Sequence, residues 1–251
     1  MNEMKIKKLL MLLVLTALPA FAWASSANPC GEVKCDAVKI DLKDKVSLQN
    51  GARIFVNYCL SCHSAAYMRY NRMGHDLGIS DEMLEEHMLF AGDKVGNLMK
   101  AVMPVADAKD WFGVAPPDLT LVTKSRSPEW VYTYLRSFYR DDKSPSGWNN
   151  VVFANVAMPH VLYEWQGNQR AVFKKDDKGT SRFHGFELER PGTMSKVEYD
   201  KAMRDLTNFM VYLGDPDKLE YQRLGVYVII FLLVFMVLAY LLKKNYWKDV
   251  N

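Results

Sequence analysis

Three residues near the start of the chain have the spacing needed to attach and ligate a haem. The segment 58–64 reads YCLSCHS, so two residues separate Cys59 from Cys62, and His63 follows at once. On a helical turn, two cysteines three positions apart share one face, where they can form thioethers to the two haem vinyl groups. The adjacent histidine is then placed to ligate the iron. The pattern predicts one covalently bound haem c.

Two other kinds of site use paired cysteines. A thioredoxin-like redox pair needs a βαβ context, but the preceding segment, Leu48–Tyr58, has the apolar spacing of an amphipathic helix. A four-cysteine zinc site would need Cys30 and Cys35, whose spacing is wider than that of zinc knuckles, and it leaves His63 unexplained. Haem attachment explains the whole motif. Whether Cys30 and Cys35 form a disulfide is left open by the sequence.

The sixth iron position decides what such a haem can do. A methionine there gives an electron carrier with a raised potential, whereas an open position suits catalysis. Met103 and Met158 each precede a proline, which stiffens a loop that must hold a sulfur against the iron. Met158 lies in the apolar stretch NVVFANVAMPHVL, whereas Met103 precedes several charged residues. The local sequence favours Met158, with His160 as a rival ligand.

The first 24 residues have the three parts of a signal peptide. Three lysines precede the apolar run 9–18, and small residues precede a cleavage point after Ala24 or, as a second choice, after Ala22. Ten apolar residues cannot span a bilayer, so a retained anchor fits less well. We expect the rest of the chain to be exported.

The second apolar run, 224–242, contains no charged residue. As a helix it would be about 28 Å long, close to the hydrocarbon thickness of a bilayer. It lacks the polar stripe of a buried soluble helix, and Lys243, Lys244 and Lys248 follow it in the positive-inside pattern. The run predicts a single transmembrane helix over 221–243.

The composition gives no support for a nucleic-acid or nucleotide partner. The 251 residues carry a formal net charge of only +3, and neither a Walker loop nor a G-x-G-x-x-G segment is present. We therefore expect no nucleic acid to bind.

Several longer segments resemble cytochrome c1, the family of haem-bearing subunits of the cytochrome bc1 complex. They are GARIFVNYCLSCHS at 51–64, APPDLTLVTKSR at 115–126, WVYTYLRSFYRD at 130–141 and GWNNVVFANVAMPHVL at 147–162, followed by the apolar tail. The resemblance runs from about Ile40 to the end of the chain. The form resembles that of Gram-negative bacteria.

The resemblance implies the roles of the iron and thioether ligands. Cys59 and Cys62 would carry the thioethers, His63 would be the proximal ligand, and Met158, rather than Met103, would be the distal one.

The resemblance also implies roles for residues around the haem. Arg126 matches an arginine that pairs with a haem propionate, and Pro117 matches a loop that lines the haem crevice. The residues alone would suggest a surface arginine and a rigid turn. Trp130, Tyr132 and Tyr134 either pack on the macrocycle or belong to the core.

The fold that the resemblance implies is mainly α, of the class I cytochrome c type. Gly51 and Phe55 match an N-terminal helix that crosses a later helix closely, and the apolar stripe over 199–213 is the best crossing partner. The segment between Glu164 and Glu189 predicts a small β-hairpin insertion. The expected domains are a signal peptide at 1–24, a periplasmic haem domain at 25–220, a transmembrane anchor at 221–243 and a cytoplasmic tail at 244–251.

The function implied is electron transfer in a bacterial inner membrane. The chain would not be an enzyme by itself but a redox subunit of a quinol–cytochrome c oxidoreductase. It would receive electrons from the Rieske iron–sulfur protein and pass them to a cytochrome c. Cytochrome b, membrane lipids and a second copy of the complex would be further partners. Two alternatives stay open: a stand-alone membrane-tethered monohaem cytochrome c feeding a terminal oxidase, and a haem enzyme such as a peroxidase.

Overall fold

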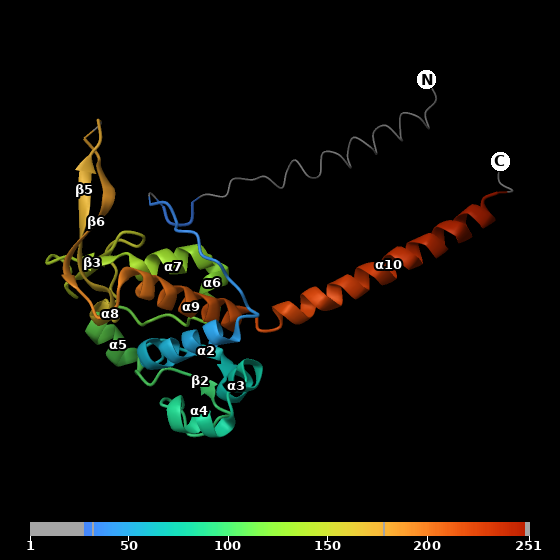
Figure 1. The fold of residues 1–251 in the computed structure, drawn as a ribbon, viewed down its shortest axis with the longest axis horizontal. Coiled ribbons are helices and arrows are strands. Elements are labelled where there is room, and N and C mark those ends of the chain that lie inside the picture. The colour runs from blue at the N-terminus through green and yellow to red at the C-terminus, as the bar shows by residue number, and fades with distance from the viewer. Residues whose placement is uncertain (1–27, 32, 178, 249–251) are drawn as a thin grey trace.

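The computed structural model describes residues 28–31, 33–177 and 179–248, so the predicted signal peptide lies outside the described residues. A mainly helical domain, the described residues up to Asp217, is followed by one long helix (Figure 1). The described part of this domain also contains three two-stranded antiparallel sheets. The predicted fold class is confirmed.

Two capped helices form the centre of the domain. Helix α2 (Lys45–Ile54) begins after Asp44, whose side chain accepts a hydrogen bond from the Ser47 N–H. Helix α9 (Lys196–Gly214) begins with a capping box formed by Ser195 and Glu198. Most of α9 is buried, as its position in the middle of the domain requires.

The two helices cross at a glycine. A Cβ atom added to Gly51 would lie 2.2 Å from the backbone oxygen of Asp205 in α9, so only a hydrogen fits there. One turn further on, the rings of Phe55 and Phe209 meet with centroids 5.7 Å apart. The predicted crossing of the N-terminal helix with the stripe over 199–213 is confirmed.

Shorter elements surround this pair and connect it to the predicted site. In chain order they are η2 (Phe55–Cys59), β1 (Ala65–Arg69), α3 (Tyr70–Leu77), α4 (Asp81–His87), β2 (Leu98–Met99), α5 (Val105–Phe112), α6 (Val122–Ser125), α7 (Pro128–Arg136), β3 (Phe138–Arg140), β4 (Trp148–Asn150) and α8 (Tyr163–Gln166). Strand β1 pairs with β2, and β3 pairs with β4. Helices α6 and α7 both pack on α9.

An extended segment at residues 33–44, called here the N-terminal strap, lies along the outside of the helical core. Its backbone is held by side chains: the Asp36 N–H donates to Thr133 Oγ1 at 2.8 Å, and the Asp41 N–H donates to Asn208 Oδ1 at 3.0 Å. Cys30 and Cys35, whose pairing the sequence left open, form a disulfide at the start of this segment.

The predicted hairpin insertion is confirmed and projects from the domain at the end away from the C-terminal helix (Figure 1). Strands β5 (Gly167–Lys175) and β6 (Ser181–Pro191) pair in antiparallel register. Only the base is buried, where Gln169 Nε2 donates to the Phe138 carbonyl at 2.7 Å. The outer part therefore contributes little to the core.

Helix α10 (Lys218–Tyr246) contains the predicted transmembrane segment 221–243. It is long and apolar enough to cross a membrane, and none of its residues is buried against the helical domain. The chain just before it is tied to the domain by ion pairs from Arg72 to Asp217, at 2.5 Å, and from Lys124 to Asp215, at 3.1 Å. The apolar surface of α10 is thus left for a lipid environment.

Candidate functional site

The predicted attachment turn directly follows the helix that crosses α9. Helix α2 continues into the π-helical turn η2, in which the Leu60 N–H bonds to the Phe55 carbonyl at 3.0 Å. The N–H groups of Cys62 and His63 then both donate to the Cys59 carbonyl, at 3.1 and 2.8 Å. Such π-turns are frequent at functional sites. The local backbone places both thiols and the imidazole on one turn.

The state of the cysteines argues against both a thioredoxin-like redox pair and a four-cysteine zinc site. Cys59 and Cys62 form no disulfide in the described residues. Burial, and to a smaller extent electrostatic repulsion from Cys62, raises the pKa of Cys59 to about 12. A redox-active Cys-x-x-C pair instead has a lowered thiol pKa. Cys30 and Cys35 are bonded to each other and cannot complete a four-cysteine zinc site.

The imidazole of His63 is oriented by a distant carbonyl. Its Nδ1 lies 2.8 Å from the backbone oxygen of Pro117, and because a carbonyl only accepts, Nδ1 carries the proton. This leaves Nε2 as the nitrogen with a free lone pair, the arrangement of most metal-ligating histidines. Burial lowers the pKa of His63, while the Pro117 carbonyl and Asp118 act in the opposite direction. The structure thus brings two of the predicted site residues together.

The segment around Pro117 is held in place by the strand that follows the attachment turn. The Leu119 N–H donates to the Ser64 carbonyl at 2.8 Å, and the Ala66 N–H donates to Asp118 Oδ2 at 2.8 Å. These bonds fix the Pro117 carbonyl relative to His63. Sequence reasoning gave Pro117 a lining role and missed this contact, for which the sequence has no signal.

A row of side chains leads from α6 along one face of α7. The exposed Arg126 guanidinium lies over the Trp130 ring, 5.4 Å from its centroid, and Trp130 stacks on Tyr134 with centroids 4.9 Å apart and planes at 10°. The spacing of four residues repeats along this face of the helix. Tyr132 is not in the row, because its ring lies under Arg136 at 4.5 Å.

Met158 lies at the end of this row. The Tyr134 hydroxyl donates to Met158 Sδ at 3.4 Å, and the methionine packs against a small buried cluster that contains Phe138 and Trp148. The polar partners of the two candidate ligands come from different segments, Pro117 for His63 and Tyr134 for Met158.

The two rival ligand candidates take other positions. His160 is buried and stacks on Phe138 with centroids 4.9 Å apart. Burial lowers the pKa of His160 to about 4, so the ring is neutral at pH 7. Met103 lies beside the attachment turn itself, where its N–H donates to the Ser61 carbonyl at 3.4 Å.

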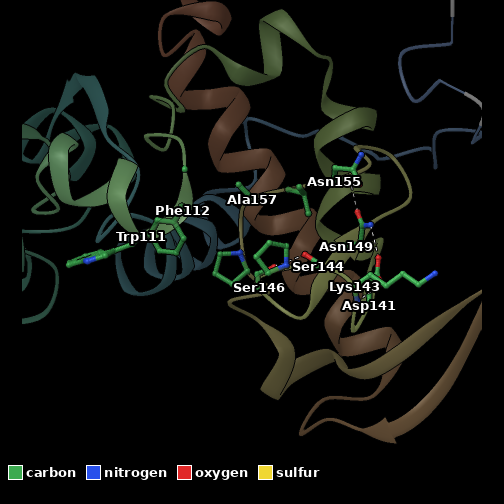
Figure 2. A pocket seen from close by; sticks show the side chains of 13 residues that line it. Trp111, Phe112, Asp141, Lys143, Ser144, Ser146, Asn149, Asn155 and Ala157 are labelled. Atoms are coloured by element: carbon green, nitrogen blue, oxygen red, sulfur yellow. Dashed lines mark hydrogen bonds between the residues drawn. The ribbon is translucent and has the colours of Figure 1, made fainter.

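A cavity of about 780 Å³ opens beside Met158 (Figure 2). The neighbours of Met158 in the chain, Ala157 and Pro159, line it, with Trp111 and Phe112 at one side. The remaining lining residues are Gly113, Asp141, Lys143, Ser144, Pro145, Ser146, Asn149, Asn155 and Val156. The attachment turn is not among them, so this opening belongs to the Met158 side of the site.

The donor set fits a covalently attached haem. Two unbonded thiols share a turn with an imidazole whose Nε2 is free, a second segment carries the half-buried thioether of Met158, and the chain neighbours of Met158 line a cavity. Elsewhere in the described part of the chain, no cluster of three or more His, Cys, Asp or Glu residues could hold a metal ion.

Comparison with known proteins gives several matches. The Cytochrome C1 family model matches residues 189–250. Cytochrome c1 of Allochromatium vinosum is 49% identical over 247 residues, covering 98% of this chain and 100% of that protein. The ammonia monooxygenase gamma subunit of Nitrosomonas europaea is 46% identical over 248 residues, with coverages of 99% and 100%. Cytochrome b/c1 of Bradyrhizobium diazoefficiens is 24% identical over 245 residues, with coverages of 82% and 34%.

Proposed function

The chain belongs to the cytochrome c1 family, and from this premise we propose that it relays single electrons from a Rieske iron–sulfur protein to a cytochrome c. Members of this family are haem-bearing electron-transfer subunits of the cytochrome bc1 complex, anchored in the membrane by a C-terminal helix. A covalent haem c supplies the one-electron redox chemistry when it is bound. The observation that carries the proposal is 49% identity to a cytochrome c1 over 98% of the chain.

On the proximal side, Cys59 and Cys62 would hold the haem through thioethers, and His63 would ligate the iron through Nε2. The Pro117 carbonyl keeps the imidazole in the tautomer and orientation that ligation needs, because it accepts the Nδ1 proton at 2.8 Å. A covalent attachment suits an exported protein, since the cofactor cannot dissociate from it.

On the distal side, Met158 is the sixth ligand. Met158 packs on the Phe138–Trp148 cluster, and its chain neighbours Ala157 and Pro159 line a cavity, so its thioether would be available to a bound haem. Met103 is less suitable because its backbone bonds to Ser61 of the proximal turn. A thioether ligand favours the reduced iron and keeps the coordination sphere closed, which suits electron transfer rather than catalysis.

Arg126 pairs with a haem propionate at the rim of the site. Its guanidinium is exposed and stacks on Trp130, so its donors remain available to a carboxylate. This position, at the start of the row that ends at Met158, supports the role that the resemblance implies.

The partners and topology follow from the same family. We place the helical domain in the periplasm and residues 244–251 in the cytoplasm, with α10 crossing a bacterial inner membrane among lipids. Cytochrome b and the Rieske protein share the complex, which forms a dimer, and the chain is no enzyme by itself. One relative is named cytochrome b/c1, which supports a close association with cytochrome b.

A second candidate is a membrane-tethered haem carrier that works outside a bc1 complex. The observation that favours it is the relative named ammonia monooxygenase gamma subunit, which is 46% identical over nearly the whole chain. Both candidates share the haem site and the anchor, so they differ only in their partners.

Gentle detergent purification through a C-terminal tag, followed by a reduced-minus-oxidised spectrum, separates the two candidates. We expect haem b bands and an iron–sulfur protein to co-purify with the haem c band. The control is the same tagged chain with Cys59→Ser and Cys62→Ser, which should lack the haem c band. Haem c alone, under conditions that preserve complexes, would contradict the first candidate and support the tethered carrier.

A further inference from the structure

The hydroxyl of Tyr134 forms a hydrogen bond to the sulfur proposed as the distal ligand. The donor oxygen lies 3.4 Å from Met158 Sδ, within the usual range for a sulfur acceptor. A phenol hydroxyl has an ordinary pKa of about 10 and carries its proton at physiological pH. A permanent donor therefore faces the thioether.

The tyrosine ring is fixed by its neighbours. It stacks on Trp130 at 4.9 Å, and the edge-to-face ring of Phe138 lies 5.1 Å away. The Tyr134 carbonyl accepts a hydrogen bond from Asn150 Nδ2 at 2.8 Å, which holds the backbone of this turn. The hydroxyl is thus aimed at Met158 by packing, and little conformational freedom is lost when it bonds.

A thioether sulfur has two lone pairs. If one lone pair ligates the iron, the other lone pair can accept the hydrogen bond from the Tyr134 hydroxyl. The hydrogen bond draws electron density from the sulfur, which makes it a weaker donor to ferric iron. Hydrogen bonding around a ligand is one of the means by which a protein tunes a haem potential.

Resting on the assignment of Met158 in the proposed function, we propose that Tyr134 is a positioning residue that orients the Met158 sulfur and raises the reduction potential of the haem. Tyr134 has no direct contact with the iron in this arrangement, and its effect passes through Met158. It is therefore distinct from the ligands and from the propionate partner Arg126.

The test is a redox titration of the full chain in its native membranes, carrying Tyr134→Phe. Phenylalanine keeps the ring packing on Trp130 and Phe138 and removes only the hydroxyl. A net hydrogen bond corresponds to about threefold to tenfold in an equilibrium constant. We expect the midpoint potential to fall by about 28 to 59 mV, that factor converted for one electron. The near-infrared sulfur-to-iron charge-transfer band should persist.

The matched control is Tyr132→Phe. It removes a hydroxyl from the same helix, but from a ring that lies under Arg136 instead of beside Met158. The potential of this variant should equal that of the unmodified chain. An equal fall in both variants, or no fall in Tyr134→Phe, would overturn the inference.

Two further measurements separate this inference from the ligand assignment. Met158→Ala should abolish the charge-transfer band and open the iron to carbon monoxide; an unchanged band would refute the assignment of Met158 itself. In the unmodified chain, transfer to D₂O should shift the iron–sulfur stretching frequency seen by resonance Raman spectroscopy. This second measurement needs no variant to fold, and an unshifted frequency would refute the hydrogen bond.

Discussion

Each of the two proposed iron ligands, His63 and Met158, has a polar neighbour from another segment of the chain. The Pro117 carbonyl binds the far nitrogen of the imidazole, and the Tyr134 hydroxyl binds the thioether sulfur. In the proposed site, the hydrogen bond accepted by the Pro117 carbonyl would make His63 a better electron donor to the iron, and the hydrogen bond donated by Tyr134 would make Met158 a weaker one. The two contacts would then act on the iron in opposite directions.

A second polar cluster, remote from the site, stabilises the helix crossing. The buried carboxylate of Asp205 accepts hydrogen bonds from Lys201 at 2.6 Å, Asn50 at 2.9 Å and Ser47 at 2.8 Å. Burial alone would raise its pKa, but these hydrogen bonds outweigh that effect and hold the pKa of Asp205 below its ordinary value of 3.8. Its stabilising contribution is thus complete above the pKa of the unfolded state and is lost as the pH falls through the lower, folded pKa.

Replacing this carboxylate, as Asp205→Asn, should reduce the free energy of unfolding by about 2 kcal/mol at pH 7, since it removes charge-assisted hydrogen bonds. The difference from the unmodified chain should shrink as the pH falls from 3.8 through the lower, folded pKa of Asp205, below which both side chains are neutral. Urea denaturation in detergent at several pH values measures both effects. The control Glu86→Gln changes an exposed carboxylate and should have no such effect. A pH-independent difference would contradict the explanation.

At the scale of elements, helix α7 serves two parts of the molecule at once. Trp130 and Tyr134, four residues apart, form the row that ends at Met158. On another face, Arg136 lies over the Tyr132 ring and pairs with Asp36 of the N-terminal strap and with Asp200 of α9. The site and the strap are therefore connected by one rigid helix.

The α2–α9 crossing depends on Gly51 having no side chain. Gly51→Ala would place a Cβ 2.2 Å from the Asp205 backbone oxygen and 2.6 Å from Phe209 Cβ, so the helices must separate. We expect a loss of about 1–3 kcal/mol in the free energy of unfolding, the usual cost of overpacking. Thermal denaturation followed at the haem band measures it. Gly96→Ala is the control, because nothing lies within 4 Å of its added Cβ. Equal melting temperatures for both variants would show that the crossing tolerates a methyl group.

At the scale of the whole molecule, the helical domain and the long helix are separable. The core lies entirely in the helical domain, and the ion pairs at the junction involve Asp215 and Asp217, which precede α10. The anchor thus adds a membrane attachment and no core contact in the described part of the chain.

A chain that ends at Asp217 should therefore fold, attach haem and appear in the soluble fraction when it is expressed without partner subunits. The reason is that removal of α10 exposes no buried apolar surface and takes away the only described helix suited to span a membrane. Fractionation followed by the haem spectrum measures the outcome. The full-length chain, which should stay in the membrane fraction, is the control. A truncated chain that remains with the membranes would show that another part of the chain binds lipid.

The patterns that the sequence alone determined are local ones. The Cys59–Cys62–His63 motif, the apolar run within α10 and the strand–turn–strand pattern of the hairpin depend on spacing along the chain, which sequence periodicity records. The helix crossing at Gly51 was predictable through the family resemblance. The tertiary structure decided two contacts between distant segments, the Pro117 carbonyl on His63 and the Tyr134 hydroxyl on Met158. It also showed that Cys30 and Cys35 are paired, which the sequence left open. Such contacts have no sequence period, because they depend on where packing places the loops that carry them.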